Sequence, residues 1–441
     1  MKSSRYNYFA ADDGKIICLN GVTGNVFAIS EDVFPLLKDI LKNPNDQIYD
    51  ANLYQSLYNL HFLIDDDLDE IDCLRKRYQD SIKGSLYKLI VNPTQECNFR
   101  CWYCYENHVK GQMNNNILER VKLFIDKTIA RTDINSFELS WFGGEPLLYF
   151  KEIIYPLARH AQCKAEKEGK SFWQTMTTNG YYLTPDIITF CKETRLTSVQ
   201  ITLDGNRELH NRTRNEQGKP SFDRILENII NFCRSNIENE VILRINYTKE
   251  VIEAGLKEVF ESIPDEVRPQ IRVNFQRVWQ TVGIEKTSEA LMEHLKYIKE
   301  LGYPLVNNTA FDIYRGKQCY ADMLNYANIN YDGNVFRCTA KEYSPENRLG
   351  YLDANGDIVW TKQDLVRKVI ESPTFENENC LKCKNLAICG GLCFNHRWNC
   401  INNSQKPECI KSKVDTDVNS FLKSYYQIHL KRREQLKQRI L

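Results

Sequence analysis

Three cysteines stand close together in the first third of the chain, at Cys97, Cys101 and Cys104. Thiolates at this spacing can hold a metal centre, but they supply only three ligands. A tetrahedral zinc ion would need a fourth ligand, which His108 could supply. A four-iron cubane held by the same thiolates would instead keep one iron open to bind a substrate. The residue types therefore predict a metal centre and leave zinc and iron–sulfur as alternatives.

A second group of cysteines lies further along the chain, where eight of the 16 cysteines fall between Cys319 and Cys409. Clustered cysteines in a reducing compartment are more often metal ligands than disulfide partners, and a chain of this length needs no disulfides to fold. The Cys-x2-Cys pair in this group, Cys380 and Cys383, would also suit a zinc ribbon. The other five cysteines are expected to be inert small apolar residues in helices or strands: Cys18, Cys73, Cys163, Cys191 and Cys233.

The composition limits the classes of function. A chain of 441 residues predicts two to three domains, and 42% hydrophobic with 26% charged residues is ordinary for a globular protein with a sizeable core. Lys+Arg and Asp+Glu are 58 each, so no basic field indicates a nucleic-acid partner. The first residues lack the apolar core of a signal peptide, and no apolar run is long enough to span a bilayer. We therefore expect a cytoplasmic protein without a nucleic-acid or membrane partner.

Strands and helices alternate from residue 86 to about 306, and the first cysteine group directly follows the first strand. This order predicts an α/β fold with a parallel sheet, open or curled into a partial barrel, in which chemistry gathers at the carboxyl ends of the strands. The predicted strands are Leu86–Val91, Phe137–Phe142, Trp173–Thr178, Val199–Leu203, Val241–Tyr247 and Ile271–Val278. The predicted helices are Ile117–Ala130, Glu152–Glu168, Pro185–Glu193, Phe222–Ser235, Val251–Ser262 and Ser288–Leu301.

Two further regions flank this alternating segment. Residues 1–85 are expected to form a small α+β domain, with two short strands between residues 15 and 29 and helices near 33–41 and 53–60. Beyond residue 306, a hairpin is expected around the turn at residues 330–334. The cysteine-dense stretch from residue 379 to 413 would depend on metal for its order. A charged helix within residues 416–441 closes the chain.

The first cysteine group resembles the signature of radical S-adenosylmethionine enzymes, Cys-x3-Cys-x2-Cys with an aromatic residue, here Tyr103, before the last cysteine. Further motifs extend the resemblance in the family's order: Gly143-Gly-Glu-Pro146 after the second strand, Thr178-Asn-Gly180 after the third, Gln200 to Gly205 with His210 and Arg214 at the fourth, and Leu243-Arg-Ile-Asn246 at the fifth. The resemblance implies a partial (β/α)6 TIM-like barrel over residues 86–306. It implies cofactor contacts by Tyr103, Gly143, Gly144, Glu145, Pro146, Thr178, Asn179, Thr202, Asp204, Arg214 and Arg244.

The residue types in these motifs agree with binding of an amino-acid group. Two consecutive glycines allow close approach of the backbone, and Pro146 removes a donor and fixes the chain. Glu145 offers an acceptor to an ammonium group, unless it is a solvated loop acid. Arg214 or Arg244 could pair with a carboxylate, and structural ion pairs are the equal alternative. Thr202 and Asp204 would point up from a strand end, where Asp204 could instead stabilise a turn.

The second cysteine group resembles the SPASM domain, which carries auxiliary iron–sulfur clusters in peptide-modifying members of the family. Its pattern here is Cys319, 13 residues, Gly333-x4-Cys338, and then Cys380-x2-Cys383-x5-Cys389-x3-Cys393. The resemblance implies two auxiliary 4Fe–4S clusters over residues 307–415. One would be held by Cys319, Cys338 and Cys393, and the other by Cys380, Cys383, Cys389 and Cys409. Cys400 is either the fourth ligand of the first cluster or a bystander.

The family resemblance implies a mechanism and a substrate class. A 4Fe–4S cluster on Cys97, Cys101 and Cys104 would bind S-adenosylmethionine, and its reductive cleavage would give a 5′-deoxyadenosyl radical that removes a hydrogen from the substrate. The SPASM pattern implies a peptide substrate. Residues 1–85 resemble the leader-recognition domain of ribosomal peptide maturases, which captures a leader strand by edge pairing. The expected product is a thioether or carbon–carbon cross-link in a precursor peptide, with a flavodoxin- or ferredoxin-type electron donor.

Two alternatives stay open. An anaerobic sulfatase-maturing enzyme oxidises a Cys or Ser to formylglycine, and in that family an aspartate follows the second SPASM cysteine and serves as base. Here Thr339 follows Cys338. A non-catalytic zinc-binding module that binds peptides is the second alternative, and the complete first cysteine group and Gly143–Pro146 motif argue against it.

Overall fold

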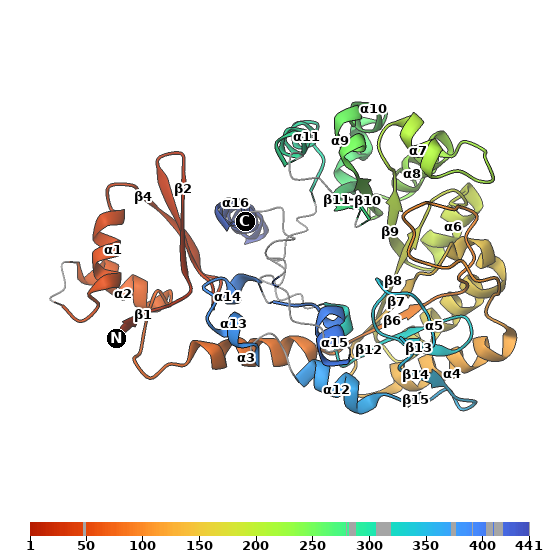
Figure 1. Cartoon of the computed structure of the whole chain (residues 1–441), viewed down its shortest axis with the longest axis horizontal. Helices are drawn as coiled ribbons and strands as arrows, with labels where there is room; N and C mark the ends of the chain where they lie inside the picture. Colours follow the sequence, from red (N-terminus) through yellow and green to blue (C-terminus); the bar gives the residue numbers. More distant parts are fainter. Residues whose placement is uncertain are drawn as a thin grey trace. The chain divides into compact units, whose positions relative to one another are not determined.

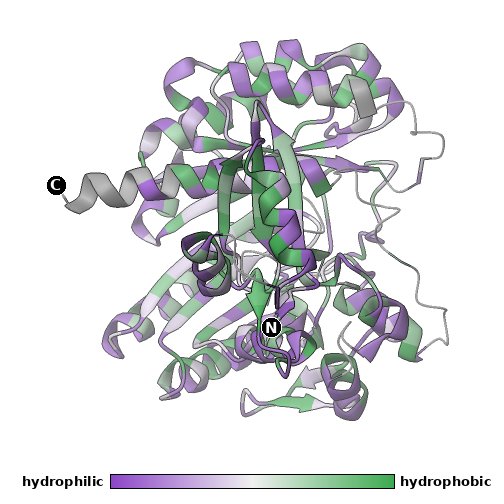
Figure 2. Ribbon diagram, turned by 90° about the vertical axis from the view of Figure 1, so that its left-hand side faces the viewer, coloured by the Kyte–Doolittle hydropathy of each residue, from purple (hydrophilic) through white to green (hydrophobic). Residues whose placement is uncertain are grey.

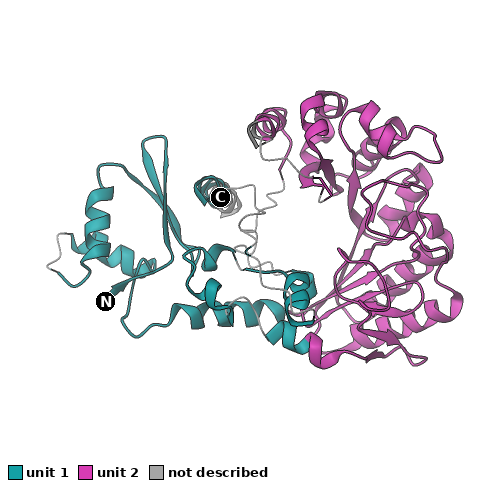
Figure 3. Ribbon diagram, viewed as in Figure 1, with its two compact units in different colours: residues 1–83, 309–322, 367–441 teal, residues 84–308, 323–366 magenta. Residues whose placement is uncertain are grey.

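The computed structural model describes residues 1–46, 50–278, 280–281, 288–305, 319–371, 376–389, 391–402, 409 and 418–440. It divides into two compact units, which we describe separately (Figure 3). Unit 1 consists of residues 1–83, 309–322 and 367–441, and unit 2 of residues 84–308 and 323–366. The expected domain boundaries near residues 306 and 415 lie outside the described residues and stay predictions, as does the boundary at residue 85.

Unit 2 is a mixed α/β unit built on a large sheet (Figure 1). Among the described residues, its strand order is β11-β10-β9-β8-β7-β6-β12-β13-β14-β15. Strands β6 to β11 are parallel, and each pairs with the next strand along the chain. Each crossover connection brings the chain back to the end of the sheet at which the previous strand began. Their bounds are β6 Leu86–Val91, β7 Ser136–Trp141, β8 Ser171–Thr178, β9 Leu196–Thr202, β10 Glu240–Tyr247 and β11 Ile271–Arg277. The six predicted strands are all present, with ends shifted by at most three residues.

The two faces of this parallel sheet differ in polarity. In β8, Phe172 and Met176 are buried beneath the helices, while Thr175 and Thr177 lie half-buried on the other face. Figure 2 shows hydrophobic and hydrophilic residues alternating around the helices of the structure. The second face is polar, and its floor includes an ion pair between Lys88 and Glu138 at 2.5 Å. One face therefore forms the core, and the other is available to polar ligands.

The helices of unit 2 bury one apolar stripe each. In α8, buried residues recur three or four positions apart, from Phe222 through Ile225 and Ile229 to Phe232. The helices are α4 Asn115–Ala130, α5 Tyr155–Lys167, α6 Pro185–Glu193, α7 Arg207–Thr213, α8 Phe222–Ser235, α9 Lys249–Ala254, α10 Lys257–Glu261 and α11 Ser288–Glu300. Short helical turns add η1 Pro146–Tyr149, η2 Phe150–Ile154 and η3 Asp265–Gln270.

The sheet continues on the other side of β6 with four short strands. The predicted hairpin is confirmed, since β12 (Tyr326–Ile329) and β13 (Asn334–Phe336) pair antiparallel. β12 also pairs parallel with β6, so the hairpin extends the main sheet, which the sequence did not indicate. The antiparallel strands β14 (Gly350–Leu352) and β15 (Ile358–Trp360) complete this extension.

Unit 1 contains an antiparallel sheet of β2 (Asn7–Asp12), β3 (Lys15–Asn20) and β4 (Val26–Ser30). Alternate residues of this sheet, such as Cys18, pack with Leu37 and Leu57 into a small hydrophobic core. The C-terminal helix α16 lies against β2, β3 and β4. The other elements are β1 Lys2–Ser3, β5 Leu63–Ile64, α1 Phe34–Lys42, α2 Ala51–Asn59, α3 Glu70–Ile82, η6 Tyr320–Asp322, α13 Glu378–Leu381, α14 Leu386–Cys389, α15 Phe394–Asn402 and α16 Val418–Ile440. Helix α12 (Gln363–Glu371) crosses the boundary between the units.

Several sequence-based element predictions were incomplete. The single helix predicted over residues 251–262 is wrong: α9 ends before Gly255, which has φ +83°, and α10 begins two residues later. The helix predicted over residues 152–168 begins as the wider turn η2 before α5. Strand β2 and helices α3 and α7 were not predicted. No helix in the described part of the chain is long and apolar enough to cross a membrane.

Candidate active site

The first cysteine group lies on the loop between β6 and α4, which we call the cysteine loop (residues 92–114). The Phe99 N–H donates to Cys97 Sγ at 3.4 Å, and the Cys104 N–H donates to the Cys101 carbonyl at 3.0 Å. Burial raises the pKa of Cys97 to about 12 and also raises the pKa of Cys101. Both thiols are therefore protonated without a metal, and metal binding would release their protons.

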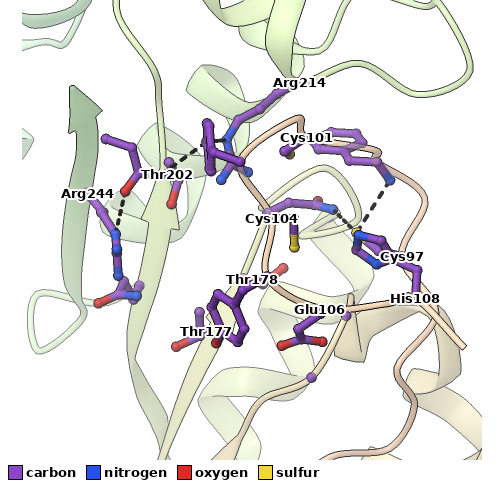
Figure 4. Close-up of a pocket in the computed structure, with 18 of the residues that line it drawn as sticks. Cys97, Cys101, Cys104, Glu106, His108, Thr177, Thr178, Thr202, Arg214 and Arg244 are labelled. Carbon is purple, nitrogen blue, oxygen red and sulfur yellow. Dashed lines mark hydrogen bonds between the residues drawn. The ribbon is translucent and has the colours of Figure 1, made fainter. Parts of the chain in front are cut away.

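All three thiols line one pocket of about 180 Å³ at the carboxyl ends of the parallel strands (Figure 4). The pocket contains polar or charged side chains from β8, β9, β10 and β11. Its lining includes Phe99, Tyr103, Tyr105, Glu106, His108, Phe142, Gly143, Gly144, Thr177, Thr178, Asn179, Gln200, Thr202, Arg214, Arg244, Asn246, Arg277, Val278 and Gln280. The structure therefore places many of the predicted residues together at this end of the strands.

The two glycines after β7 are needed for a close approach to the cysteine loop. A Cβ atom on Gly143 would lie 2.3 Å from the Thr94 carbonyl oxygen, and one on Gly144 would lie 2.2 Å from that of Glu96. The Glu145 N–H donates to the same Glu96 oxygen at 2.8 Å. The two glycines thus allow the loop after β7 to pack directly against the backbone of the cysteine loop. Both glycines also line the pocket.

Glu145 is completely buried and is not a solvated loop acid. Its carboxylate accepts hydrogen bonds from the Thr178 hydroxyl at 2.7 Å, the Asn179 N–H at 2.7 Å and the Leu147 N–H at 3.0 Å. Burial raises the pKa of Glu145 to about 7, and these hydrogen bonds oppose that rise. Glu145 therefore joins the end of β8 to the loop after β7. The following Pro146 opens the helical turn η1.

Asn179 connects the end of β8 with the cysteine loop. Its amide group donates to the Asn98 side-chain oxygen at 2.7 Å and lies 3.9 Å from Cys97 Sγ. Thr178 and Asn179, both predicted site residues, therefore border the pocket on the side where Cys97 lies.

Tyr103 and Arg214 meet at the ends of β9 and β10. Arg214 Nε donates to Asp204 at 2.8 Å and to the Tyr103 hydroxyl at 2.9 Å, and the Tyr103 hydroxyl also contacts Asp204. Asn246 donates to the same hydroxyl at 3.1 Å. His210 is buried beneath this group, where its ring accepts from the Asp204 N–H at 3.2 Å. Arg214 and Asp204 thus form the structural ion pair that the sequence left as an alternative.

Arg244 differs from Arg214 in having no acidic partner among the described residues. Its Nε donates to Asn246 Oδ1 at 2.7 Å, and burial lowers the pKa of its guanidinium. Thr202, on the neighbouring strand β9, also lines the pocket and is 8% exposed. Both residues were predicted.

Sequence reasoning missed further polar groups in the pocket, above all Glu106. Burial raises the pKa of Glu106 to about 7, and its Oε2 is buried without a hydrogen-bond partner. No motif marks this residue, because a single acid two positions after Cys104 has no distinctive spacing. Thr177 and Arg277 were also missed, although each belongs to a strand whose carboxyl end was predicted, and Gln200 was part of the β9 motif but was not predicted as a contact.

The side chains around the pocket can be matched to the two metal centres that the sequence allowed, a zinc ion and a four-iron cluster. His108 lines the pocket, and both of its ring nitrogens are buried without a hydrogen bond. Among the described residues, however, no three His, Cys, Asp or Glu side chains converge as the ligands of a single ion would. The ligands of a cubane bind different iron atoms and need only surround a cavity. Three cysteines around one pocket fit a cluster, and a preformed zinc site is not present in the described part of the chain.

The second cysteine group is partly brought together in unit 1. Burial raises the pKa of Cys380 to about 11, helped by the neighbouring thiols of Cys389, Cys383 and Cys409. These are the four residues expected to share one auxiliary cluster. Cys393 forms a hydrogen bond with His396 Nδ1 at 3.2 Å. Cys319 also lies in unit 1, Cys400 lies in α15, and Cys338 follows β13 in unit 2.

The five remaining cysteines differ in burial. Cys18, Cys191 and Cys233 are buried, as expected for inert small residues. Cys73 is half-buried and Cys163 is exposed, so burial does not explain these two.

The fold and the pocket define a strand–helix protein with a three-cysteine centre at the carboxyl edge of its parallel strands. Residues 91–263 match the model of the Radical SAM superfamily, and this segment contains all of the motifs that surround the pocket up to Arg244. The resemblance of these motifs to radical SAM enzymes is thereby confirmed, and residues 91–263 form a radical SAM domain.

Curated relatives agree with this assignment. The cysteine-type anaerobic sulfatase-maturating enzyme of Clostridium novyi (strain NT) is 22% identical over 339 residues, which cover 70% of this chain and 88% of that protein. The GTP 3′,8-cyclase of Klebsiella pneumoniae is 31% identical over 156 residues, or 34% of this chain and 43% of the cyclase. The first match extends far beyond the segment that matches the superfamily.

Among solved structures, native anSMEcpe with bound AdoMet is similar with a TM-score of 0.55 and 17% identity, covering 81% of this chain and 100% of that chain. The same protein with bound AdoMet and Cp18Cys peptide gives a TM-score of 0.53. These similarities show the fold.

Proposed function

We propose that this protein is a peptide maturase that forms a thioether or carbon–carbon cross-link in a ribosomally made precursor peptide. The proposal rests on the pocket in which Cys97, Cys101 and Cys104 lie beside Gly143, Gly144 and the polar ends of four strands. A 4Fe–4S cluster on these cysteines, with S-adenosylmethionine bound, would supply a carbon radical that removes a hydrogen atom from the substrate. A flavodoxin- or ferredoxin-type protein would donate the electron.

The chain's own residues would bind the cofactor and exclude water. Gly143 and Gly144 expose backbone to the pocket, and Glu145 holds them against β8 through Thr178 and Asn179. Phe99 and Phe142 provide apolar walls beside the cysteines. A highly reactive radical is directed mainly by position, so this rigid, partly apolar lining is the protein's contribution to selectivity.

Two auxiliary clusters belong to the proposal. The proximity of Cys380 to Cys383, Cys389 and Cys409 supports the second of them. Cys319, Cys338 and Cys393 would hold the first, and Cys400 is either its fourth ligand or a bystander. Through such clusters the enzyme would accept an electron from the substrate or bind a substrate thiolate.

A peptide partner is supported by the relatives. A solved structure of the same fold, native anSMEcpe, has AdoMet and Cp18Cys peptide bound. Within residues 1–83, the sheet of β2, β3 and β4 has two edge strands, and three of the five residues of the edge strand β4 are half-buried. We propose that a leader segment of the precursor pairs with an edge of this sheet.

Formation of formylglycine is the second candidate, favoured by the long match to the sulfatase-maturating enzyme of Clostridium novyi. That match leaves about a third of this chain uncovered. Where that family is expected to have its aspartate base, this chain has Thr339, whose carbonyl accepts from the Tyr105 hydroxyl. Threonine cannot accept a proton near neutral pH, so cross-linking is the better proposal.

Replacement of Cys97, Cys101 and Cys104 by alanine tests the cofactor assignment. We expect the iron content to fall by about four atoms per chain, which is one cubane, and formation of 5′-deoxyadenosine to stop. The matched control is Cys163→Ala, an exposed cysteine of α5. Continued cleavage of S-adenosylmethionine by the triple variant contradicts the assignment. Mass spectrometry of a precursor peptide encoded beside the gene, before and after treatment with an aldehyde-reactive hydrazide, then separates the candidates. A loss of two hydrogens per cross-link without hydrazide labelling supports our proposal, and a hydrazide-labelled product, as formylglycine would be, overturns it.

A further inference from the structure

The pocket contains three arginines, and only one of them has a carboxylate partner in the described part of the chain. Arg214 pairs with Asp204 at 2.8 Å. Arg244 and Arg277 both line the pocket, and neither forms an ion pair with a described residue. After the Arg214–Asp204 pair is set aside, Glu106 is the one acidic side chain among the described lining residues. The pocket therefore has an excess of positive charge on the side of β10 and β11.

Arg244 is held in place for binding. Its Nε donates to Asn246 Oδ1, so the guanidinium is fixed along β10 while its terminal nitrogens form no hydrogen bond with a described residue. Burial lowers the pKa of this group, which reflects the cost of a charge withdrawn from water without a counter-charge. An arginine in this state is stabilised by an anion, and its planar donors match a carboxylate.

The two arginines serve different parts of the pocket. The positive charge of Arg214 lowers the pKa values of all three cysteine thiols, which burial raises. Apart from burial, the groups that shift the pKa of Arg244 most are instead Tyr105, Arg214, Tyr103 and Asp204. Figure 4 shows Arg244 on the side of the pocket opposite Cys97 and His108. Arg214 is therefore the cation near the cysteine centre, and Arg244 lies beyond it.

Arg277 extends this positive surface toward the pocket rim. It is the last residue of β11, it is exposed, and Tyr247 of β10 is its register partner. Arg244 and Arg277 thus stand on adjacent strands and line the same pocket. Two such groups can attract an acidic ligand and bind it inside.

We propose that Arg244, assisted by Arg277, binds a carboxylate of the substrate peptide and so selects an acidic residue close to the reacting position. This inference rests on the proposed function, since it takes the ligand beyond the cysteine centre to be a peptide. The carboxylate can belong to an aspartate or glutamate side chain or to a peptide's C-terminus. Both sources share the chemistry and are separated below.

The test uses the protein with its clusters and S-adenosylmethionine bound. Three probes are compared by isothermal titration: acetyl-Gly-Asp-Gly-amide, acetyl-Gly-Asn-Gly-amide, and acetyl-Gly-Gly-Gly with a free C-terminal carboxylate. We expect the native protein to bind the Asp peptide about tenfold more tightly than the Asn peptide, the strength of one charge-assisted contact. If acetyl-Gly-Gly-Gly binds more tightly than the Asp peptide, the bound carboxylate is that of a peptide C-terminus and not that of a side chain.

Variants then locate the contact. Arg244→Gln should abolish the preference for Asp over Asn, Arg244→Lys should keep part of it, and Arg277→Gln should reduce it less. Arg234→Gln is the matched control, because Arg234 is exposed on α8 and pairs with Glu266. It should leave the preference unchanged. Equal unfolding midpoints for the variants exclude misfolding, and Arg244→Lys carries the test if the glutamine variant does not fold.

Affinity for S-adenosylmethionine, measured by equilibrium dialysis, provides the decisive comparison. We expect it to change less than twofold in Arg244→Gln. If it falls there as much as in Arg214→Gln, Arg244 is a cofactor contact and the inference is overturned. The inference is also overturned if neither the Asp peptide nor the peptide with a free C-terminus is preferred over the Asn peptide in a way that depends on Arg244. Failure of the proposed function itself would be seen separately, as a native protein that forms no 5′-deoxyadenosine.

Discussion

One oxygen atom links the cysteine loop to the ends of two strands. The Tyr103 hydroxyl contacts Asp204 of the loop after β9, accepts from Arg214, and accepts from Asn246 of β10. A buried hydroxyl with several polar and charged partners is costly to remove. Its partners stay buried away from water but lose a hydrogen bond that compensated for that burial. Tyr103 was selected from sequence as the aromatic residue before Cys104, but the partners of its hydroxyl lie 101 to 143 residues further along the chain. Residue type was predictable, and partner identity was not.

Replacing Tyr103 by phenylalanine should therefore lower the free energy of unfolding by about 1–3 kcal/mol. Only the oxygen is lost, and the ring that lines the pocket is retained. Urea unfolding of the two proteins measures the difference. Tyr297→Phe is the control, since Tyr297 of α11 is half-buried and its hydroxyl donates to the carboxylate of Glu261 at an exposed position. If both substitutions have the same small effect, the Tyr103 hydroxyl does not anchor the cysteine loop.

Glu145 and Arg214 illustrate a related limit. Their motifs predicted acidic and basic site residues, and both do border or support the pocket. The sequence alone did not determine whether the side chain of Glu145 or Arg214 is solvated, is paired with an opposite charge, or is available to a ligand. Burial and distance decided this, because Glu145 accepts three internal hydrogen bonds and Arg214 is paired with Asp204. Arg244 has the same residue type and a different state, which only its surroundings reveal.

At the scale of elements, the site depends on two loops that touch through their backbones. The loop after β7 approaches the cysteine loop so closely that only glycine fits at positions 143 and 144. The order of strands β6 to β11 was predictable from apolar periodicity, since buried parallel strands and amphipathic helices have distinct repeats. The contact between the two loops was not predictable from the sequence, because it joins segments about 50 residues apart that meet only in the folded structure. The break at Gly255 was missed for a local reason: apolar spacing continues across it.

Substitution of Gly144 by alanine tests this loop contact. The added Cβ would lie 2.2 Å and 2.4 Å from two backbone oxygens, those of Glu96 and Gln95, so one loop must move. We expect a loss of about 1–3 kcal/mol in unfolding free energy, as for other overpacked sites, and less iron bound per chain. Gly84→Ala is the control, since a Cβ there meets nothing within 4 Å. Full iron content and an unchanged unfolding midpoint in Gly144→Ala would show that the two loops need not approach so closely.

At the scale of the whole molecule, the two ends of the chain meet within unit 1. Helix α16 lies against β2 and β3, where Leu422 is fully buried and Tyr425 donates to the Gly24 carbonyl at 3.3 Å. The buried pair of Arg397 and Asp322 joins two further segments of the same unit. Charge and periodicity predicted that a helix closes the chain, but not that it covers the N-terminal sheet, since long-range pairing leaves no local signal. Deleting residues 1–85 would thus also uncover α16 and is a poor test of leader binding.

Leu422→Ala tests whether the chain ends depend on each other. The substitution removes a fully buried side chain between α16 and the sheet, so we expect unit 1 to lose about 2–5 kcal/mol of stability. Amide hydrogen exchange should become faster in β2 and β3 of unit 1, while β6 to β10 of unit 2 keep their protection. Ser424→Ala, at an exposed position of the same helix, should change stability by less than about 0.5 kcal/mol. Equal exchange rates in β2 and β3 for both variants would mean that α16 adds nothing to the N-terminal sheet. In that case deletion of residues 1–85 would again be a clean test of leader capture.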